Sequence, residues 1–469
     1  MKRILCLLLT LVMILTLCAC SGSDAPEASE AGNDMSEGLY AGFGRENVTP
    51  DYPTGLGGYS DQETRTSTGF VDYIYTTCIA VTSGEETILM FTVDTCAIGR
   101  DRAEEIRQAV TLATGIPRDK IFAAGTHCHS APSWAGYDNA ERYKTDILVA
   151  CVKAAQTALA DRSPAQLKAA TPEFEGMNFV RHYLMADGTY AGSNFGSFSS
   201  GIVDHAAEAD HQMVLVQFDR AEDKKDILMV NWQAHPDSGS EIGYNTIAAS
   251  WIGPLRTKLE SLSGMQVAYF TGPSGNLTKD SKMESKKNGL DWRGYGEKMA
   301  ELTNGALADL KPVEGTAIKT TGTMFTVEID HSWDHLLKEA NDVYNLWKSA
   351  GKSAGDALGK QYGFTSSYQA RAIKSRATMG ATTELEVNAF SIGGIGFTTG
   401  TYEMFTSNAM YVKEHSPFDI TFLMTGNSSY IPSEDAFNYR CYEADTGYYA
   451  KGTGEKLADN YVKMLEEVK

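Results

Sequence analysis

The hydrophobic pattern of the chain alternates between apolar stretches of strand length and amphipathic stretches of helical spacing. The first pair is an apolar stretch at 86–95 and a periodic stretch at 100–115 that closes on Gly115. The same alternation predicts pairs at 121–126 and 142–161, 226–234 and 251–264, 265–272 and 290–310, 386–400 and 402–417, and 418–426 and 455–468. Strands separated by helices of this length predict an α/β fold, a single large domain with mixed or parallel sheets flanked by helices.

Polar residues follow the predicted strands at the points where those strands end. The segments concerned are GTHCHS from Gly125, HPDS from His235, GPSGNLT from Gly272, GTYE from Gly400 and NSSYIPS from residue 427. In α/β folds, sites are assembled in the loops beyond the carboxyl ends of the strands. We therefore expect one site at the carboxyl ends of these strands.

The N-terminus has the pattern of a targeting segment. Basic Lys2 and Arg3 precede an apolar run, which predicts a signal peptide over 1–19 and not a spanning helix. Cys20 follows a small residue, as in a bacterial lipobox, so we expect a lipid on Cys20 and a lipoprotein at the outer face of the membrane in the cell envelope. A plain secretory cleavage site is the alternative. Residues 20–37 lack bulky side chains and predict a flexible tether, which leaves 38–469 as the folded domain.

The net charge limits the classes of partner, and the cysteine pattern argues against a fold held by disulfides. The formal net charge of −19 argues against nucleic acid or a bare anionic membrane as a partner, because both would repel the chain. The cysteines beyond Cys20 are odd in number, widely spaced and free of CxxC, so they predict buried thiols and not a disulfide framework. They are Cys78, Cys96, Cys128, Cys151 and Cys441.

The HxH pair in GTHCHSAP carries the first chemical signal. His127 and His129 are two residues apart, so on extended backbone both rings project to the same side. This arrangement suits two ligands of one metal ion, or one ligand beside an acid/base group, or a pair of hydrogen-bonded loop histidines. His235 at another strand end strengthens the metal hypothesis. Glu403 could add a carboxylate, although a solvated residue in the first turn of a helix is the alternative.

A second histidine pair, His331 and His335, is spaced four apart at a predicted helix start. It superficially resembles a metalloprotease helix, but Ser332 stands where that motif has glutamate. We interpret this pair as helix capping and surface. The scattered His182, His205, His211 and His415 receive no ligand role.

Five segments, in order along the chain, resemble the N-terminal catalytic domain of the neutral/alkaline, non-lysosomal ceramidase family. They are GFGRENVTPDYPTGLGGY from Gly42, GTHCHSAP from Gly125, GMNFVRHYLMADG from Gly176, NWQAHPDS from Asn231 and SSYIPSEDAFNYRCYEAD from Ser428. The resemblance covers the chain from about Gly38 onward. The chain stops about where that domain ends, before the immunoglobulin-like C-terminal domain of ceramidases.

The resemblance implies a zinc site. Position by position, it assigns the zinc ligands to His127, His235, Glu403 and Tyr430, with His129 as the neighbouring acid/base or substrate-binding group. Two imidazoles, a carboxylate and a phenol oxygen are ligands that suit zinc.

The same resemblance assigns three further catalytic or substrate-binding residues. Arg181 stands where the family has an arginine that binds substrate oxygen, and Tyr442 stands where a tyrosine helps to polarise the scissile carbonyl. Thr278 replaces a serine, within GNLTKD where the family has GDxSPN or a close variant. The changed loop, and GTYE in place of a Gly-Glu turn, are departures from the family pattern.

These observations predict a zinc-dependent hydrolase of an amide bond, ceramidase-like and directed at an N-acylated, lipid-like substrate such as those of sphingolipid metabolism. Water activated by the metal would attack the carbonyl while His129 handles protons. Two alternatives stay open. One is hydrolysis of an ester or a sugar-linked amide on the same scaffold, and the other is a non-catalytic, ligand-binding surface lipoprotein.

Overall fold

The computed structural model describes residues 38–59, 65–134, 139–221, 223–426 and 428–469. The predicted signal peptide, Cys20 and the tether therefore lie outside the described residues. The described residues from 38 onward belong to one compact unit. No described helix combines the length and the apolar character that crossing a membrane requires.

A nine-stranded mixed sheet is the larger of the two main sheets. Its strand order is β14-β12-β11-β6-β1-β3-β4-β5, with β16 paired to β6. Only β4 with β5 and β12 with β14 pair in parallel, and the other ladders in this order are antiparallel. The strands are β1 (Leu39–Asn47), β3 (Tyr75–Ser83), β4 (Glu86–Val93), β5 (Ile121–Gly125), β6 (Ser163–Ala170), β11 (Val214–Arg220), β12 (Ile227–Trp232), β14 (Gln266–Thr271) and β16 (Lys311–Pro312).

A four-stranded sheet forms the second layer, in the order β17 (Ile318–Glu328), β18 (Thr382–Ile392), β19 (Ile395–Gly400) and β21 (Ile420–Thr425). β19 and β21 are parallel, whereas the other two ladders are antiparallel. The apolar stretch at 386–400, expected to be one strand, is a hairpin that turns at Gly393 with φ of 53°. A continuous apolar pattern does not reveal a turn made by two adjacent glycines.

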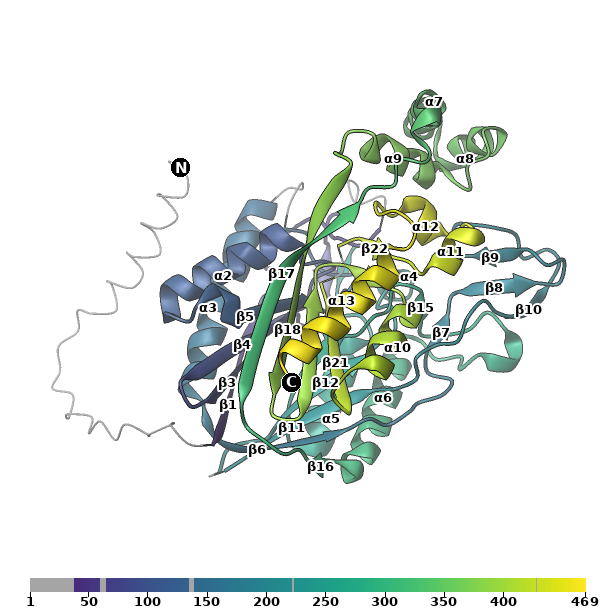
Figure 1. The fold of residues 1–469 in the computed structure, drawn as a ribbon. Coiled ribbons are helices and arrows are strands. Elements are labelled where there is room, and N and C mark those ends of the chain that lie inside the picture. The colour runs from purple at the N-terminus through teal and green to yellow at the C-terminus, as the bar shows by residue number, and fades with distance from the viewer. Residues whose placement is uncertain (1–37, 60–64, 135–138, 222, 427) are drawn as a thin grey trace, which may run out of the picture. The chain divides into compact units, whose positions relative to one another are not determined.

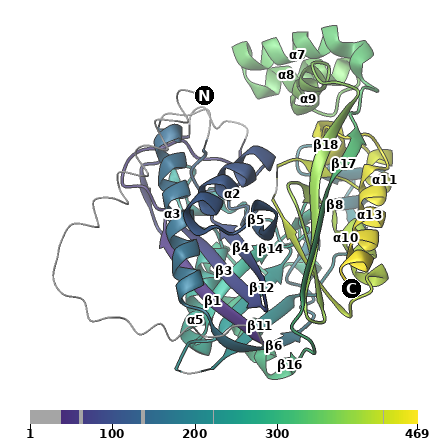
Figure 2. The ribbon, with the colours of Figure 1, turned by 60° about the vertical axis from the view of Figure 1, so that its left-hand side comes forward.

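The two sheets pack face to face and helices cover both outer faces, as Figure 2 shows. The rings of Phe122 and Phe390 stack across the sheet interface with centroids 4.3 Å apart. Along β4, Ile88 and Met90 face the second sheet while Leu89 and Phe91 face the helices. Because both faces are buried, such strands appear in the sequence as unbroken apolar runs.

Helices α2 (Arg100–Thr114), α3 (Ala140–Ala160), α5 (Ile252–Ser263) and α6 (Trp292–Ala306) cover the larger sheet. Helices α10 (Thr406–His415) and α13 (Thr453–Glu467) cover the smaller one. Helix α3 packs directly on β1, where a Cβ at Gly42 or Gly44 would lie 2.0 Å from a carbonyl oxygen of the helix. These helices and strands confirm the predicted α/β class.

A helical insertion lies between β17 and β18, at the top of Figure 1. It comprises α7 (Leu337–Ala350), α8 (Lys352–Gln361) and α9 (Ser367–Arg376), and we call it the cap. The cap has a small hydrophobic core of its own, which includes Val343, Phe364 and Ile373. Arg376 donates a 2.7 Å hydrogen bond to the carbonyl of Gly447, just after α12 (Tyr442–Thr446). The cap was not among the predicted strand–helix pairs.

Three βαβ units set where the site lies. They are β4-α2-β5, β12-α5-β14 and β19-α10-β21, each with a parallel strand pair. Hydrogen bonds link the carboxyl ends of their strands, from Thr271 Oγ1 to Thr126 O at 2.7 Å and from Thr425 Oγ1 to Thr271 O at 3.2 Å. The segments that follow these strands therefore meet, as the sequence predicts.

Candidate metal centre and its cavity

Three histidines from two strand ends meet in one place. His127 and His129 follow β5, and His235 follows β12. Nε2 of His127 lies 2.9 Å from Nε2 of His235 and 3.2 Å from Nε2 of His129. All three side chains are buried, and His127 has a left-handed backbone with φ of 61°. Such a conformation is strained for a residue other than glycine, and strain of this kind clusters at functional sites.

Backbone carbonyls hold the opposite ring nitrogens of two of these histidines. Nδ1 of His127 lies 2.6 Å from Cys96 O, and Nδ1 of His235 lies 3.3 Å from Ser274 O. A carbonyl oxygen only accepts, so both Nδ1 atoms donate and the neutral rings present lone pairs at Nε2. Two lone pairs 2.9 Å apart repel each other unless a cation lies between them. Metal-bound histidines commonly donate from their other ring nitrogen to a backbone carbonyl, as Nδ1 of His127 and Nδ1 of His235 do here.

Glu403 adds a carboxylate from the short strand β20 (Glu403–Met404). Its side chain is buried, and Oε2 lies 3.3 Å from Nε2 of His127. Oε2 makes no hydrogen bond within the described part of the chain. One ligand atom from each of His127, His235 and Glu403 lies within 4.8 Å of the others. Two imidazole nitrogens and a buried, unsatisfied carboxylate oxygen fit a divalent metal ion, so these three residues could hold one.

The buried carboxylate of Glu403 favours one positive charge beside it, either a proton on His127 or a metal ion. Burial alone would lower the pKa of His127, but the carboxylate of Glu403 and the hydrogen bond at Cys96 together outweigh burial and raise the pKa well above its usual value. Burial lowers the pKa of His129 and of His235 well below the usual value, and neighbouring cations add to this. A proton on His127 and a metal ion therefore compete for the same position.

His129 lies beside the cluster and is held by its backbone. Its N–H donates to Pro236 O at 3.1 Å, and Gly58 packs so closely that a Cβ there would lie 2.5 Å from His129 Cγ. His129 forms a second cluster with Cys96 and His127 whose ligand atoms also lie within 4.8 Å of one another. Nδ1 of His129 is buried and has no hydrogen-bond partner in the described residues.

Tyr430 is the register partner of Glu403. The strand β22 (Tyr430–Ile431) pairs in parallel with β20, which sets Glu403 opposite Tyr430. The Tyr430 hydroxyl accepts a 3.2 Å hydrogen bond from Arg181, and its ring lines a cavity above the histidines. The structure therefore brings all four residues expected to be metal ligands to one end of the sheets.

Arg181 is fixed by a buried ion pair. It follows β7 (Phe179–Val180), and its guanidinium donates to Glu443 Oε1 at 2.8 Å and to Gly275 O at 2.9 Å. His182 Nε2 lies 2.8 Å from the other oxygen of Glu443, which is 1% exposed. Burial would raise the pKa of Glu443, but His182 and Arg181 prevail and lower it to about 2. Arg181 therefore presents a fixed charge at the cavity floor.

Tyr442 and Thr278 occupy different positions relative to the cavity. Tyr442 lines it, with its ring 6.2 Å from the ring of Tyr430, and burial raises its pKa to about 12. Thr278 lies on β15 (Leu277–Thr278), paired with Phe179 of β7, and is not among the described residues of the cavity wall. The roles predicted for both residues stay predictions.

A cavity of about 640 Å³ opens above the histidines. His129, His235 and Arg181 lie at its floor, and the cap supplies one wall. The other described wall residues are Gly58, Tyr59, Ser193, Asn194, Asp237, Tyr244, Trp347, Lys348, Lys352, Tyr368, Tyr430 and Tyr442. Loop, strand-end and cap residues thus enclose the space next to the candidate metal centre.

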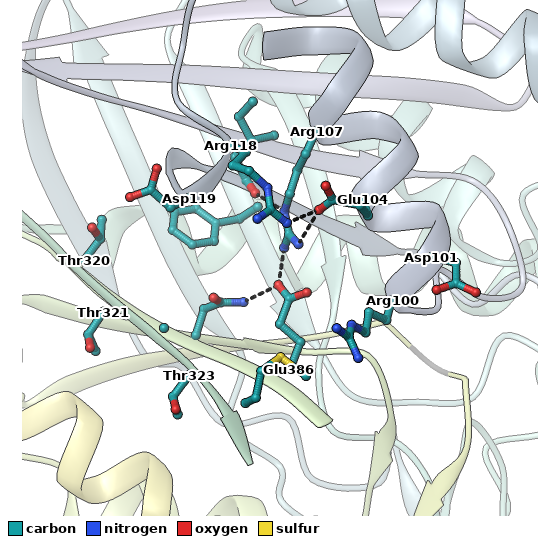
Figure 3. Close-up of a pocket in the computed structure, with 15 residues that line it drawn as sticks. Arg100, Asp101, Glu104, Arg107, Arg118, Asp119, Thr320, Thr321, Thr323 and Glu386 are labelled. Carbon is teal, nitrogen blue, oxygen red and sulfur yellow. Dashed lines mark hydrogen bonds and ion pairs between the residues drawn. The ribbon is translucent and has the colours of Figure 1, made fainter. Parts of the chain in front are cut away.

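A larger hollow of about 950 Å³ lies elsewhere, between α2 and the strands β17 and β18 (Figure 3). Four of its charged groups form ion pairs, Arg107 with Glu386 at 2.5 Å and Arg118 with Glu104. No histidine or cysteine stands among the described residues that line it. We therefore place the candidate site at the smaller cavity.

The histidine pair His331 and His335 forms no metal cluster within the described residues. His331 Nδ1 bonds to Asp334 at 2.8 Å, and His335 Nδ1 donates to Ser332 O at 3.1 Å. These local contacts agree with the surface interpretation, but neither histidine caps a helix, because neither the 3-10 turn at Asp334–Leu336 nor α7 has a side-chain cap at its start.

Two residues next to the site carried no prediction, Glu443 and Asp237. Both stand inside segments that carried the family resemblance, YEAD and HPDS. Glu443 contacts Arg181 across 262 positions of sequence, which no local pattern indicates. Asp237 lines the cavity, and burial raises its pKa. The cap residues carried no sequence signal beyond helical periodicity.

No family model matches the sequence, and no curated protein matches it. Solved structures, in contrast, match this chain in three dimensions. A neutral ceramidase from Pseudomonas aeruginosa superposes with a TM-score of 0.66 at 13% identity, covering 92% of this chain and 74% of that chain. A ceramidase complexed with C2 superposes with a TM-score of 0.66 at 15% identity, covering 92% and 75%. The resemblance predicted from the motifs is thus confirmed in three dimensions, and this chain has the fold of neutral ceramidase.

Proposed function

We propose that this protein is a zinc-dependent hydrolase that cleaves an amide bond. The observation that carries the proposal is the convergence of Nε2 of His127, Nε2 of His235 and Oε2 of Glu403, with both imidazoles fixed by backbone carbonyls at Nδ1. The fold shared with neutral ceramidase supports the choice of an amide bond.

Zinc is the ion proposed because two nitrogen ligands, a carboxylate and a phenol oxygen suit it. His127, His235 and Glu403 would hold it, and Tyr430 would complete the set from its position opposite Glu403. When bound, zinc supplies a Lewis acid that polarises a carbonyl oxygen and lowers the pKa of water towards about 7.

The residues of the chain itself position the substrate and move protons. His129, neutral because burial lowers its pKa, is the proton acceptor at the cavity floor. Arg181, locked by Glu443, and Tyr442 of the cavity wall are donors to the oxygen of the amide. Donors held in place before the reaction stabilise developing negative charge without reorganising.

The substrate proposed is an N-acylated amphiphile, in keeping with the ceramidases that share the fold. With a lipid on Cys20 and the tether over 20–37, the enzyme would work at the outer face of the membrane. A lipid anchor of this kind would keep the catalytic domain close to membrane-derived substrates.

The test is to measure the metal content and amide hydrolysis of the purified protein with the variants His127→Ala and His235→Ala. Short-chain N-acyl amides that release a fluorescent amine serve as the substrates. We expect one zinc per chain in the parent, and loss of zinc and of turnover in both variants. His331→Ala is the matched control, because this histidine lies outside the cluster. Undiminished zinc in both site variants would refute the proposal.

A further inference from the structure

The wall of the cavity is made of amphipathic rings. Trp347, Tyr368, Tyr442 and Tyr430 form a row from the cap to the floor, with successive ring centroids 5.2, 5.7 and 6.2 Å apart. On the other side Tyr59 and Tyr244 meet at 5.4 Å. No leucine, isoleucine, valine, methionine or phenylalanine stands among the described lining residues. A site for a long alkyl chain would be lined predominantly by such side chains.

Polar groups are interspersed between the rings. Ser193, Asn194 and Asp237 line the cavity, and Asn194 has a left-handed backbone with φ of 65°. The Tyr59 hydroxyl is fixed, since it donates to Asp237 O at 2.6 Å and accepts from Gly239 N at 3.0 Å. An alkyl chain would desolvate these groups without bonding to them, which is costly. A ligand that carries several hydroxyl groups would bond to them.

The charges of the cavity argue against a cationic ligand. Aromatic rings can enclose a quaternary ammonium group. Here Arg181, Lys348 and Lys352 also line the space. Lys352 lies 4.7 Å from the ring centroid of Tyr368 and pairs with Asp356 at 2.7 Å, so a cation already occupies a ring face of the wall. A neutral ligand with several hydroxyl groups suits this wall. Its C–H faces would stack on the aromatic rings, and its hydroxyls would bond to the amide of Asn194 and the carboxylate of Asp237.

We propose that the amine half of the substrate is a polyhydroxylated, sugar-like amine and that the acyl half is short, so that the enzyme hydrolyses N-acylated amino sugars. This rests on the proposed amide hydrolysis, and it replaces the lipid-like substrate with the amide of an amino sugar. In the reaction, water adds to the amide carbonyl carbon, the C–N bond breaks, and the nitrogen takes up both protons of the water, so the products are an ammonium group on the sugar and a carboxylate. The rings from Trp347 to Tyr430 meet edge to face, so one of them would stack on the sugar ring while its neighbours contact the sugar or its acyl group.

The experiment compares kcat/KM of the zinc-loaded protein for amides that share one acyl group, such as hexanoyl. The amines are glucosamine, hexylamine, a sphingoid base and an aniline, and N-acetylglucosamine tests the short acyl group. We expect the amino sugar to be preferred over each of the other amines by roughly tenfold or more, the scale of a few lost hydrogen bonds and ring contacts.

Two wall variants test where the preference arises. Trp347→Ala should raise KM for the amino sugar by about tenfold while leaving hydrolysis of the hexylamine amide within about twofold. Trp347→Phe, which keeps a ring in the cap, should recover most of the preference and controls for misfolding. Tyr362→Phe is the matched control, because Tyr362 packs in the cap core and is not on the described cavity wall.

The outcomes separate this inference from the proposed function. Zinc-dependent hydrolysis that favours the sphingoid, hexylamine or aniline amide would overturn the inference and leave the hydrolase intact. Equal rates with all amines, or a preference that Trp347→Ala does not alter, would also overturn it. Hydrolysis of no amide at all would overturn both.

Discussion

The floor of the cavity and its cap are built in different ways. Each floor histidine follows a strand end and is tied to a backbone carbonyl of another segment, as His127 is to Cys96 and His129 to Pro236. The cap residues Trp347 and Tyr368 stand instead on inserted helices with a small core of their own.

This difference separates chemistry from selectivity. Side chains on the floor cannot shift without moving the ends of two packed sheets, so they are suited to holding a metal ion and a developing charge. Side chains on the cap can change without disturbing that core, so they are suited to choosing the substrate. Floor substitutions should therefore change kcat and metal content, and cap substitutions should change KM.

The largest effect is expected from His235→Ala at the floor. Loss of one imidazole leaves His127 and Glu403 unable to retain the ion, so kcat/KM should fall by about 10³-fold or more and the bound metal should disappear. Metal analysis and steady-state kinetics measure both. If this variant kept both its metal and its full turnover, the assignment of the chemistry to the floor and of selectivity to the cap would be wrong.

The pH dependence of the free energy of unfolding tests whether Glu443 is a buried, ionised partner of Arg181 and His182 below the floor. Its folded pKa, about 2, lies below its ordinary value of 4.5, so its stabilising contribution is present above about pH 5 and is lost as the pH falls towards 2. The loss should amount to about 3 kcal/mol, since each pKa unit corresponds to about 1.4 kcal/mol. Urea unfolding between pH 6 and 3 measures about 2 kcal/mol of this loss, because the rest falls below pH 3. A wild-type protein that loses no more stability with acid than Glu443→Gln does would contradict this assignment.

The kinetic effect of Glu443→Gln should be somewhat smaller. The change removes the charge that fixes Arg181 and leaves the metal ligands in place, so kcat should fall by about 10²-fold with unchanged metal content. Glu443→Asp keeps the charge and should recover part of the rate. Loss of metal in the glutamine variant would show that Glu443 supports the whole site and not Arg181 alone.

Tyr442→Phe tests a donor of the cavity wall that stands between the cap and the floor. Removing one hydroxyl that donates to the substrate oxygen should lower kcat by about tenfold while KM stays nearly constant. Tyr362→Phe is the control outside the cavity wall. An unchanged kcat would remove Tyr442 from the proposed machinery.

The smallest effect is expected from Lys352→Ala on the cap. This residue lines the cavity but already pairs with Asp356, so its loss should raise KM by about threefold without changing kcat. A large fall in kcat would mean that the cap takes part in the chemistry.

The three floor histidines could be predicted from the sequence because each follows an apolar strand, whereas Arg181 follows only the two-residue strand β7 and was predicted through the family resemblance. Buried strands such as β4, β12 and β14 were visible as apolar runs, and the polar residues after strand ends could then be expected to meet. The helices after them were visible as periodic stretches, confirmed with ends that differ by a few residues.

The cap, the hairpin and the ion pair could not be predicted in the same way. The hairpin of β18 and β19 looks like one apolar run, and most ladders of the large sheet are antiparallel, which periodicity does not determine. The role of Glu443 depends on Arg181, brought next to it only by the folded chain. The cap helices have ordinary amphipathic patterns, and nothing local shows that Trp347 and Tyr368 would face a cavity.

The most direct test of the metal centre is a crystal structure recorded at the zinc absorption edge. We expect one anomalous peak at about 2.0–2.2 Å from Nε2 of His127, Nε2 of His235 and a carboxylate oxygen of Glu403. No peak at that position in zinc-loaded protein, or zinc held only by Cys96 with His129, would contradict the account.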